Sequence, residues 1–300
     1  LVFGCLGVAF APWVDSQVVW CNSSQVALEP FQGVTAMTLS SNSFGGDSAP
    51  KVKPEDFSNW ILFEDDDFLA MDKPGWLVCH PSKDGPWSSL VGACRASRGL
   101  NEVHLVSRLD RETSGVVLMA KNKKAASFAQ KAVQDRRVSR TYLALMEGEF
   151  AESLVAEGWL GNDPDSLVFV KQRVTSRSAK AKRALTRITP LLLSNGYTLA
   201  AIRPETGRKH QIRVHSQWLG FPLVGEKLYG HDETLYLEFV ENGWTSRLEK
   251  FLPMPRQALH AATFRLDASD RELAFDAPFP ADMRDFCIAR MGLAQEFLEE

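Results

Sequence analysis

Residues 105–120 read LVSRLDRETSGVVLMA, a polar turn that runs directly into an apolar segment. The segment from Val116 to Ala120 has the composition of a buried strand. Asp110 stands before it, in Thr-Ser-Gly turn chemistry that can hold a carboxylate at the edge of a sheet. Catalytic groups concentrate on loops that a rigid scaffold carries. We therefore expect Asp110 to do chemistry, and the rest of the chain to position it or bring it a substrate.

An aspartate in a turn most often caps the chain or faces water, but two features of the sequence favour a functional carboxylate here. Apolar residues on both sides would partly bury it, and a buried carboxylate is costly without a partner. Arg208 and Arg213 supply a distant cationic segment, and the planar guanidinium suits a carboxylate. Glu112 is the nearest other acid, and nothing in the spacing indicates a glycosidase with two carboxylates.

The pattern of apolar residues and turns predicts more strands than helices. With 300 residues, 45% of them hydrophobic and 24% charged, the chain has an ordinary globular composition. Because the strands do not alternate strictly with helices, we expect an α+β fold with a mixed, largely antiparallel central sheet flanked by helices. The expected strands are 60–63, 68–71, 76–79, 116–120, 140–146, 154–159, 167–173, 184–193, 197–202 and 258–264, and the expected helices are 88–98, 122–137, 208–219 and 281–291.

The first 54 residues differ in composition from the rest. Residues 1–10 are apolar but lack the basic start of a signal peptide, and they are too short to span a membrane. Residues 40–54 are rich in Ser, Gly and Pro, as linkers are. We expect 1–54 to be an unstructured or misassigned lead-in, with Met37 as a start, and 55–295 to be one catalytic domain. Residues 231–255 read as an irregular insertion.

The cysteines and histidines argue against a metal centre. The five cysteines are scattered and odd in number, and neither a C-x-x-C nor an H-E-x-x-H pattern is present. The sequence thus predicts no disulfide framework and no metal, and it fits the reducing cytoplasm.

Charge is distributed unevenly along a chain whose net charge is only −3. Residues 121–213 hold 18 Lys and Arg against 8 Asp and Glu, whereas the remainder holds 16 against 29. A surplus of this kind makes a local positive field that a polyanion feels, although solvated helix faces are the alternative explanation. If the partner is a nucleic acid, the basic segments 121–140 and 171–187 are the expected surface for its backbone.

Several separate segments resemble one family in its order along the chain. The stretch around Asp110 resembles the catalytic motif of the RluA branch of the pseudouridine synthases. Other motifs of that branch are matched by DKPGWLVCHP at 72–81, RTYLAL at 140–145, TGRKHQIRVH at 206–215, GFPLVG at 220–225 with the following Tyr-Gly, and LHA at 259–261. Together they cover roughly residues 60–290.

The resemblance implies a pseudouridine synthase fold with a catalytic cleft across the sheet. It implies an isomerase that converts uridine in RNA to pseudouridine without cofactor or metal, by breaking the C–N glycosidic bond, turning the base and rejoining it through carbon. The catalytic residues would be Asp110, Tyr142 and Arg213. The residues expected to contact substrate are Arg108, Thr113, Arg208, His210 and Ile212.

The implied roles are specific. Asp110 would attack C1′ of the ribose or assist its deprotonation, with Arg213 as its ion-pair partner. Tyr142 would stack on the uracil near C5, and Ile212 would line the base pocket, although ordinary core packing is the alternative for Ile212. Arg108 would fill the space left when the uridine leaves its stack.

The chain departs from the family pattern where Ser107 replaces a histidine and Glu226 replaces an aspartate. The alternatives are an RNA-binding or ribosome-assembly factor of the same fold without catalysis, and a hydrolase acting on a small nucleoside. We expect an RNA partner, ribosomal or transfer RNA and most simply a small stem-loop, a monomeric protein, and no membrane association.

Overall fold

The computed structural model describes residues 50–81, 84–268 and 271–294, and its strands form one sheet. The strand order is β1-β2-β4-β10-β5-β9-β8-β6-β7, with β3 paired to β4 and β11 paired to β10. Every pairing between these strands is antiparallel except that of β10 with β4. The mixed, largely antiparallel sheet is therefore confirmed.

The strands are β1 (Ile61–Glu64), β2 (Phe68–Lys73), β3 (His104–Leu105), β4 (Ser114–Ala120), β5 (Val138–Glu147), β6 (Leu154–Asn162), β7 (Gln172–Thr175), β8 (Lys182–Ser194), β9 (Tyr197–Pro204), β10 (Leu259–Ala268) and β11 (Arg271–Asp276). The α-helices are α1 (Pro54–Phe57), α2 (Leu90–Arg98), α3 (Lys123–Gln134), α4 (Gln211–Trp218), α5 (Thr234–Asn242), α6 (Ser246–Phe251) and α7 (Ala281–Met291). Short 3₁₀ turns lie at Ser58–Trp60 and Pro86–Ser88. Within the described residues no helix is long and apolar enough to cross a membrane.

The strand β4, which follows Asp110, is buried along its whole length because it has helices on both faces. Alternate residues, including Val116 and Leu118, pack in a core cluster with α3, whereas Val117 and Met119 pack in a second cluster with α2. A strand buried on both faces reads as a continuous apolar run, as the sequence indicated.

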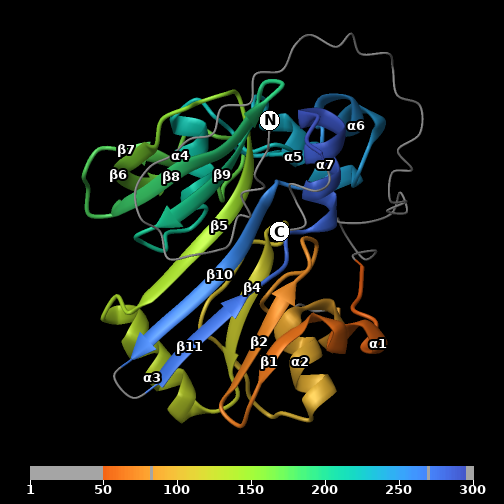
Figure 1. Cartoon of the computed structure of the whole chain (residues 1–300), viewed down its shortest axis with the longest axis vertical. Helices are drawn as coiled ribbons and strands as arrows, with labels where there is room; N and C mark the ends of the chain where they lie inside the picture. Colours follow the sequence, from red (N-terminus) through yellow and green to blue (C-terminus); the bar gives the residue numbers. More distant parts are fainter. Residues whose placement is uncertain (1–49, 82–83, 269–270, 295–300) are drawn as a thin grey trace, which may run out of the picture.

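Two long strands, β5 and β10, run through the middle of the molecule and join its two ends (Figure 1). One end holds β1, β2, β4 and helices α1 to α3, and the other holds β6 to β9 with α4, α5 and α6 (Figure 1). β10 pairs with β4 at His260 and Ala261, with β5 along most of its length, and with β11 at its end. Residues from both ends of the molecule therefore meet beside β10.

Several expected elements are absent or differ. The expected strand 167–173 is wrong: that segment is mainly turns, in which Leu167 and Phe169 are 72% and 88% exposed while Val168 is buried. The expected strand 76–79 reduces to a single bridge between Val78 and Ser89. Residues 231–255 are not irregular, because they contain α5 and α6. The hairpin β10–β11 was not predicted beyond its first strand.

The end of α4 follows the sequence, whereas its start does not. Gly220, at φ 86°, ends the helix as expected for a glycine in the left-handed region. The helix begins at Gln211 rather than Arg208, because His210 also has a positive φ of 54°. Of the expected lead-in, the structure describes only residues 50–54, where Val52 is buried and donates its backbone N–H to Trp87. Residues 1–49, with the linker and Met37, lie outside the described residues.

Candidate functional site

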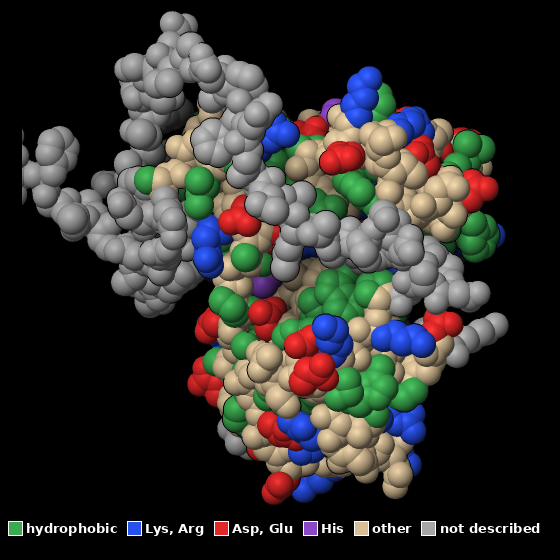
Figure 2. Space-filling view, turned by 90° about the vertical axis from the view of Figure 1, so that its right-hand side faces the viewer, with side chains coloured by type: hydrophobic (Ala, Val, Ile, Leu, Met, Phe, Trp, Pro, Cys, Tyr) green, Lys and Arg blue, Asp and Glu red, His purple; other side chains and the backbone are tan. Residues whose placement is uncertain are grey.

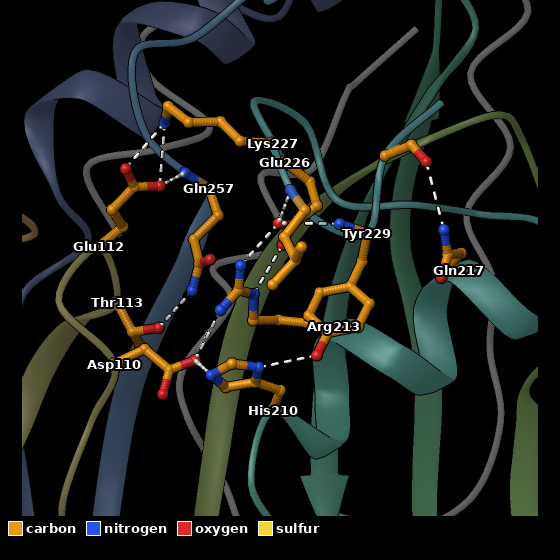
Figure 3. A network of polar contacts seen from close by, with 12 residues as sticks. Asp110, Glu112, Thr113, His210, Arg213, Gln217, Glu226, Lys227, Tyr229 and Gln257 are labelled. Carbon is orange, nitrogen blue, oxygen red and sulfur yellow. Dashed lines mark hydrogen bonds and ion pairs between the residues drawn. The ribbon is translucent and has the colours of Figure 1, made fainter. Parts of the chain in front are cut away.

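Asp110 lies in the turn that enters β4, held by the N–H of Thr113, which donates to the Asp110 carbonyl at 3.2 Å. Its side chain is 28% exposed. The Oδ2 atom accepts a hydrogen bond of 3.0 Å from Nη1 of Arg213 on α4. Figure 3 shows the second carboxylate oxygen turned away from Arg213, and within the described residues it has no hydrogen bond. One oxygen is thus anchored and the other is available.

Arg213 bridges two carboxylates. Its Nε and Nη2 donate to the two oxygens of Glu226 at 2.8 and 2.7 Å, while Nη1 reaches Asp110. Glu226 is fully buried and also accepts the backbone N–H groups of Leu228 and Tyr229. The Arg213 guanidinium lies 5.0 Å from the Tyr229 ring centre. Because two of its nitrogens are hydrogen-bonded to Glu226, the planar guanidinium has a fixed orientation and presents one N–H to Asp110.

The charges set the protonation states. Burial alone would raise the pKa of Asp110, but the positive charge of Arg213, with smaller contributions from His210 and Arg108, holds that pKa below its ordinary value. The same arginine outweighs burial at Glu226 and lowers its pKa. Both carboxylates, through their attraction, raise the pKa of Arg213 well above its ordinary value in spite of its burial. The site therefore holds two carboxylates and one cation.

His210 stands between Asp110 and Tyr229 (Figure 3). Its Nε2 is 3.8 Å from Oδ2 of Asp110, and its Nδ1 is 2.7 Å from the hydroxyl of Tyr229. Burial and the nearby Arg213 charge lower the pKa of His210 to about 4, so the ring is neutral at neutral pH. The Tyr229 hydroxyl accepts the backbone N–H of Gln172, and donation of its proton to Nδ1 satisfies both groups.

A second ion pair holds the turn from its other side. Lys227, beside Glu226, donates to both oxygens of Glu112 at 2.8 and 3.0 Å. Gln257 donates its backbone N–H to Glu112 and its amide to the hydroxyl of Thr113 at 2.7 Å. The carboxylate of Glu112 thus points away from Asp110 and into the protein (Figure 3).

Two further cations pin the turn through backbone carbonyls. The ammonium of Lys73 is fully buried and donates to Arg111 at 3.0 Å, as well as to Pro74 and Leu77. Burial lowers the pKa of Lys73 to about 7. Arg256 donates to the carbonyl of Glu112 at 3.2 Å. The carbonyls of Arg111 and Glu112 are consequently held by Lys73 and Arg256, which come from distant segments of the chain.

Tyr142, on β5, opposes Ala261 on β10 and Ile202 on β9. It is 8% exposed and shares a core cluster with Ile212, against which Leu109 also packs. Burial raises the pKa of Tyr142, and Asp110 is close enough to raise it further. An apolar wall containing a tyrosine therefore adjoins the carboxylate.

The other expected substrate residues differ in accessibility. Arg108 is exposed, and in the described part of the chain its side chain has no hydrogen bond or ion pair. Arg208 is exposed and donates to the carbonyl of Arg183 at 3.0 Å. Thr113 is only 2% exposed and its hydroxyl is occupied by Gln257. Ser107, which stands in the place of the family histidine, is buried and accepts the N–H of Leu118 at 3.4 Å.

Sequence reasoning missed Glu226, the partner of Arg213, and it missed the residues that hold the turn, namely Lys73, Lys227, Arg256 and Gln257. Lys73 lies in a segment that resembles a family motif, and Glu226 and Lys227 directly follow another, but such a resemblance does not say which distant side chain a residue meets. Glu112 and Lys227 are 115 positions apart. For Glu226 and Lys227 a signal was present in GEKLYG at 225–230. Two adjacent charges in a buried turn each need a partner of opposite charge.

The acid and base groups of the site do not make a metal centre. Within the three described ranges, no three His, Cys, Asp or Glu side chains are grouped so that they could hold a metal ion. On the face shown in Figure 2, the acidic and basic side chains are interspersed rather than segregated.

Comparison with protein-family models gives a match to the family described as RNA pseudouridylate synthase, over residues 67–218. This range includes Asp110, Tyr142 and Arg213. An uncharacterized RNA pseudouridine synthase of Bacillus subtilis, YjbO, is 34% identical over 230 residues, which are 74% of this chain and 73% of that protein. Ribosomal large subunit pseudouridine synthase D of Salmonella typhimurium is 32% identical over 245 residues, 80% of this chain and 72% of the relative.

Another relative, an uncharacterized RNA pseudouridine synthase of Mycoplasma pneumoniae, is 37% identical over 187 residues, but the match spans only 58% of its length. Among solved structures, human RNA pseudouridylate synthase domain containing 1 superposes with a TM-score of 0.58 at 26% identity, covering 73% of this chain and 82% of that one. The human domain containing 4 protein, at 23% identity, shares the fold with a TM-score of 0.61, covering 80% of this chain and 96% of that one.

Proposed function

The chain belongs to the RNA pseudouridylate synthase family, and on that premise we propose that it isomerises uridine in RNA to pseudouridine with Asp110 as the catalytic carboxylate. The observation that carries the proposal is the ion pair of 3.0 Å between Asp110 and Arg213. It joins two motifs of the family across 103 positions of sequence and leaves one carboxylate oxygen available.

The proposed reaction needs an ionised carboxylate in a site with little water. Asp110 attacks C1′ of the ribose or removes a ribose proton, the bond from C1′ to N1 of the uracil breaks, and the base turns. A bond from C1′ to C5 then forms as the bond from C1′ to Asp110 breaks or the ribose proton returns. The C5 proton leaves to solvent, and N1 of the base takes up a proton, so that the product is an isomer of uridine. Arg213 keeps Asp110 ionised, which is supported by the lowered pKa of that carboxyl. Exclusion of water protects the intermediate from hydrolysis.

The remaining residues would bind the flipped uridine. We assign the face of the uracil to Tyr142 and the wall of its pocket to Ile212, since both lie in the apolar cluster beside Leu109. The exposed Arg108 would occupy the space that the uridine leaves, at an unstacking cost of a few kcal/mol. The neutral His210 would hydrogen-bond the substrate near Asp110.

Thr113 contributes indirectly in this proposal, by holding the Asp110 turn through Gln257. Arg208 would contact the RNA backbone together with the basic segments 121–140 and 171–187. Phosphate contacts of this kind position a substrate without selecting its sequence.

We also propose ribosomal or transfer RNA as the substrate, and a monomer acting in the cytoplasm. One relative is named for the large ribosomal subunit, which favours ribosomal RNA. The described cysteines, Cys79, Cys94 and Cys287, are free and buried, as in proteins of a reducing compartment.

The decisive experiment is the release of tritium from RNA labelled at C5 of uridine, combined with pseudouridine mapping of total RNA from cells with and without the gene. Asp110→Asn should lower the rate by at least about a thousandfold, as expected when a group that reacts is removed. Asp276→Asn is the matched control, because Asp276 is 64% exposed on the edge strand β11. Its rate should equal that of the wild type.

Two results would change the assignment. Wild-type activity that survives in Asp110→Asn would remove this residue from the chemistry. Tight binding of the labelled RNA by the wild type, without release of tritium, would favour the alternative of a binding factor without catalysis.

A further inference from the structure

A groove of about 540 Å³ lies between α2 and α3, alongside β3. Its volume is within the range of small-molecule sites. The walls include Arg95 from α2 and Gln130 and Val133 from α3, and β3 supplies His104 at its side. We call this feature the α2–α3 groove. None of the residues that contact the Asp110 side chain lines this groove.

Two chain segments lead from the lining of the α2–α3 groove to the catalytic turn. The segment that lines it through Val106 continues through Arg108 to Asp110. At the same end His80, also in the lining, follows Cys79, whose sulfur contacts the backbone N and O of Leu109, each at 3.4 Å. His104 and Asp110 are six positions apart, and an extended chain of that length spans at most about 20 Å. An RNA strand with one nucleotide at Asp110 therefore has near neighbours within reach of the groove.

Polar groups in the groove lack partners. The Nε2 atom of His104 is buried without a hydrogen bond, since the nearest carboxylate oxygen, on Glu102, is 3.6 Å away. Buried polar atoms of this kind ordinarily have a partner. Within the described residues, the side chains of Arg95, His80 and Gln130 also have no hydrogen bond or ion pair, and all three are exposed.

The chemistry of the lining matches a nucleotide. A guanidinium binds a phosphate, an amide and an imidazole can read the edge of a base, and apolar residues such as Val106 and Val133 offer a surface to its face. The charge around the groove is favourable as well: Lys123 lies within 3.8 Å of Glu102 and offsets it, and Lys131 adds a further exposed cation on α3.

From these observations we propose that the α2–α3 groove binds an unpaired nucleotide of the RNA substrate that neighbours the target uridine, with Arg95 on its phosphate and His104 and Gln130 at its base. This rests on the proposed function for the identity of the substrate. Single-stranded RNA is commonly recognised through bases that are splayed out of their stack. The groove thereby adds a second point of contact to the flipped uridine, and helps to select RNA segments that can open at two positions.

Binding of a fluorescein-labelled octauridylate tests the proposal, with the protein carrying Asp110→Asn so that no turnover occurs. Arg95→Ala should weaken binding by about threefold to tenfold. It should also make the slope of log affinity against log salt shallower by about 0.7, the value for one phosphate contact to a single strand. Gln130→Trp, which fills the groove from an exposed helix position, should weaken binding comparably. Arg290→Ala is the charge-matched control on α7, and it should bind as the parent does.

Photocrosslinking gives an independent readout. An octauridylate containing 4-thiouridine should crosslink to peptides that cover residues 104–106 and 126–133. Affinity and salt slope unchanged in both groove variants, together with crosslinks elsewhere, would overturn the proposal. The two proposals fail separately: tritium release by the wild type with unaltered groove variants rejects the groove alone, whereas groove-dependent binding without tritium release rejects the proposed reaction alone.

Discussion

Arg213 gives the carboxylate at position 110 both its charge state and its direction. An arginine bound only to Asp110 could swing with it, but the two hydrogen bonds to Glu226 fix the guanidinium before any substrate arrives. Glu226 replaces the shorter aspartate of the family pattern and still reaches two backbone N–H groups as well as the arginine. Preorganised charge of this kind costs no rearrangement during the reaction.

Arg213 should therefore determine the pH below which the reaction slows, because it sets the pKa of the Asp110 carboxyl. Because the pKa of Asp110 is depressed in the folded protein, its ionisation stabilises the fold above its ordinary pKa, and this stabilisation is lost as pH falls through the depressed value. The acid limb of kcat/KM should accordingly lie below the ordinary aspartate range. In Arg213→Gln combined with Glu226→Gln, only the smaller contributions of His210 and Arg108 oppose the effect of burial on the pKa of Asp110, so the limb should move to higher pH.

The double substitution is preferred because Arg213→Gln alone would leave the buried carboxylate of Glu226 without its cation. That would lower the free energy of unfolding by about 3–5 kcal/mol. Arg290→Gln, on the exposed face of α7, serves as the control whose acid limb should not move. An unchanged acid limb in the double variant would show that Arg213 does not set the ionisation of Asp110.

At the scale of elements, the sequence predicted those whose apolar pattern coincides with burial. The run 116–120 is buried on both faces in β4, and the spacing of Ala125, Ala129 and Ala132 marks the buried face of α3. The expected strand at 167–173 was wrong, because its apolar residues Leu167 and Phe169 lie at the surface. An apolar pattern shows which residues could be buried, but not where the segment lies in the molecule. For the site, the pairing of Asp110 with an arginine was predictable from the cost of burial, whereas the clamps from Lys227 and Gln257 depend on pairings across more than 100 positions.

The parallel contact of β4 with β10 depends on Gly115. At φ +104° this residue lies where side chains are strained, and a Cβ would come within 2.3 Å of the Ala261 carbonyl oxygen. Gly115→Ala should lower the free energy of unfolding by about 2–4 kcal/mol, from strain and overpacking together. Gly99→Ala is the matched control, because it also has a positive φ but no atom within 4 Å, and should cost about 1 kcal/mol. Urea unfolding measures both, and equal losses would contradict the steric argument.

For the molecule as a whole, the segregation of charge along the chain matters more than its net charge of −3. The face in Figure 2 mixes both signs, so a polyanion has no reason to prefer it. Lys180 and Lys182, at the start of β8, are exposed, and within the described residues their side chains have no ion pair. They belong to the basic segment that we assign to the RNA backbone.

Replacing both lysines with glutamine should weaken RNA binding uniformly across sequences and flatten its salt dependence by about 1.4 in the log–log slope, or about 0.7 for each lost contact. Lys51→Gln with Lys53→Gln is the matched control, since those two lysines are exposed near α1, outside the basic segments. Equal slopes for the two double variants, measured by fluorescence anisotropy, would place the RNA elsewhere.

The clamp on the Asp110 turn also has a consequence for the order of events during synthesis. Arg256 holds the carbonyl of Glu112 from a position 144 residues further along the chain. At ribosomal rates of about 5–20 residues per second, the turn waits on the order of 7–30 s before its clamp emerges. A nascent chain that has exposed both Asp110 and Arg213 therefore has the contact from Lys73 but still lacks those from Lys227, Arg256 and Gln257. Modification of RNA by this protein should begin only when the strand that follows Arg256 has left the ribosome.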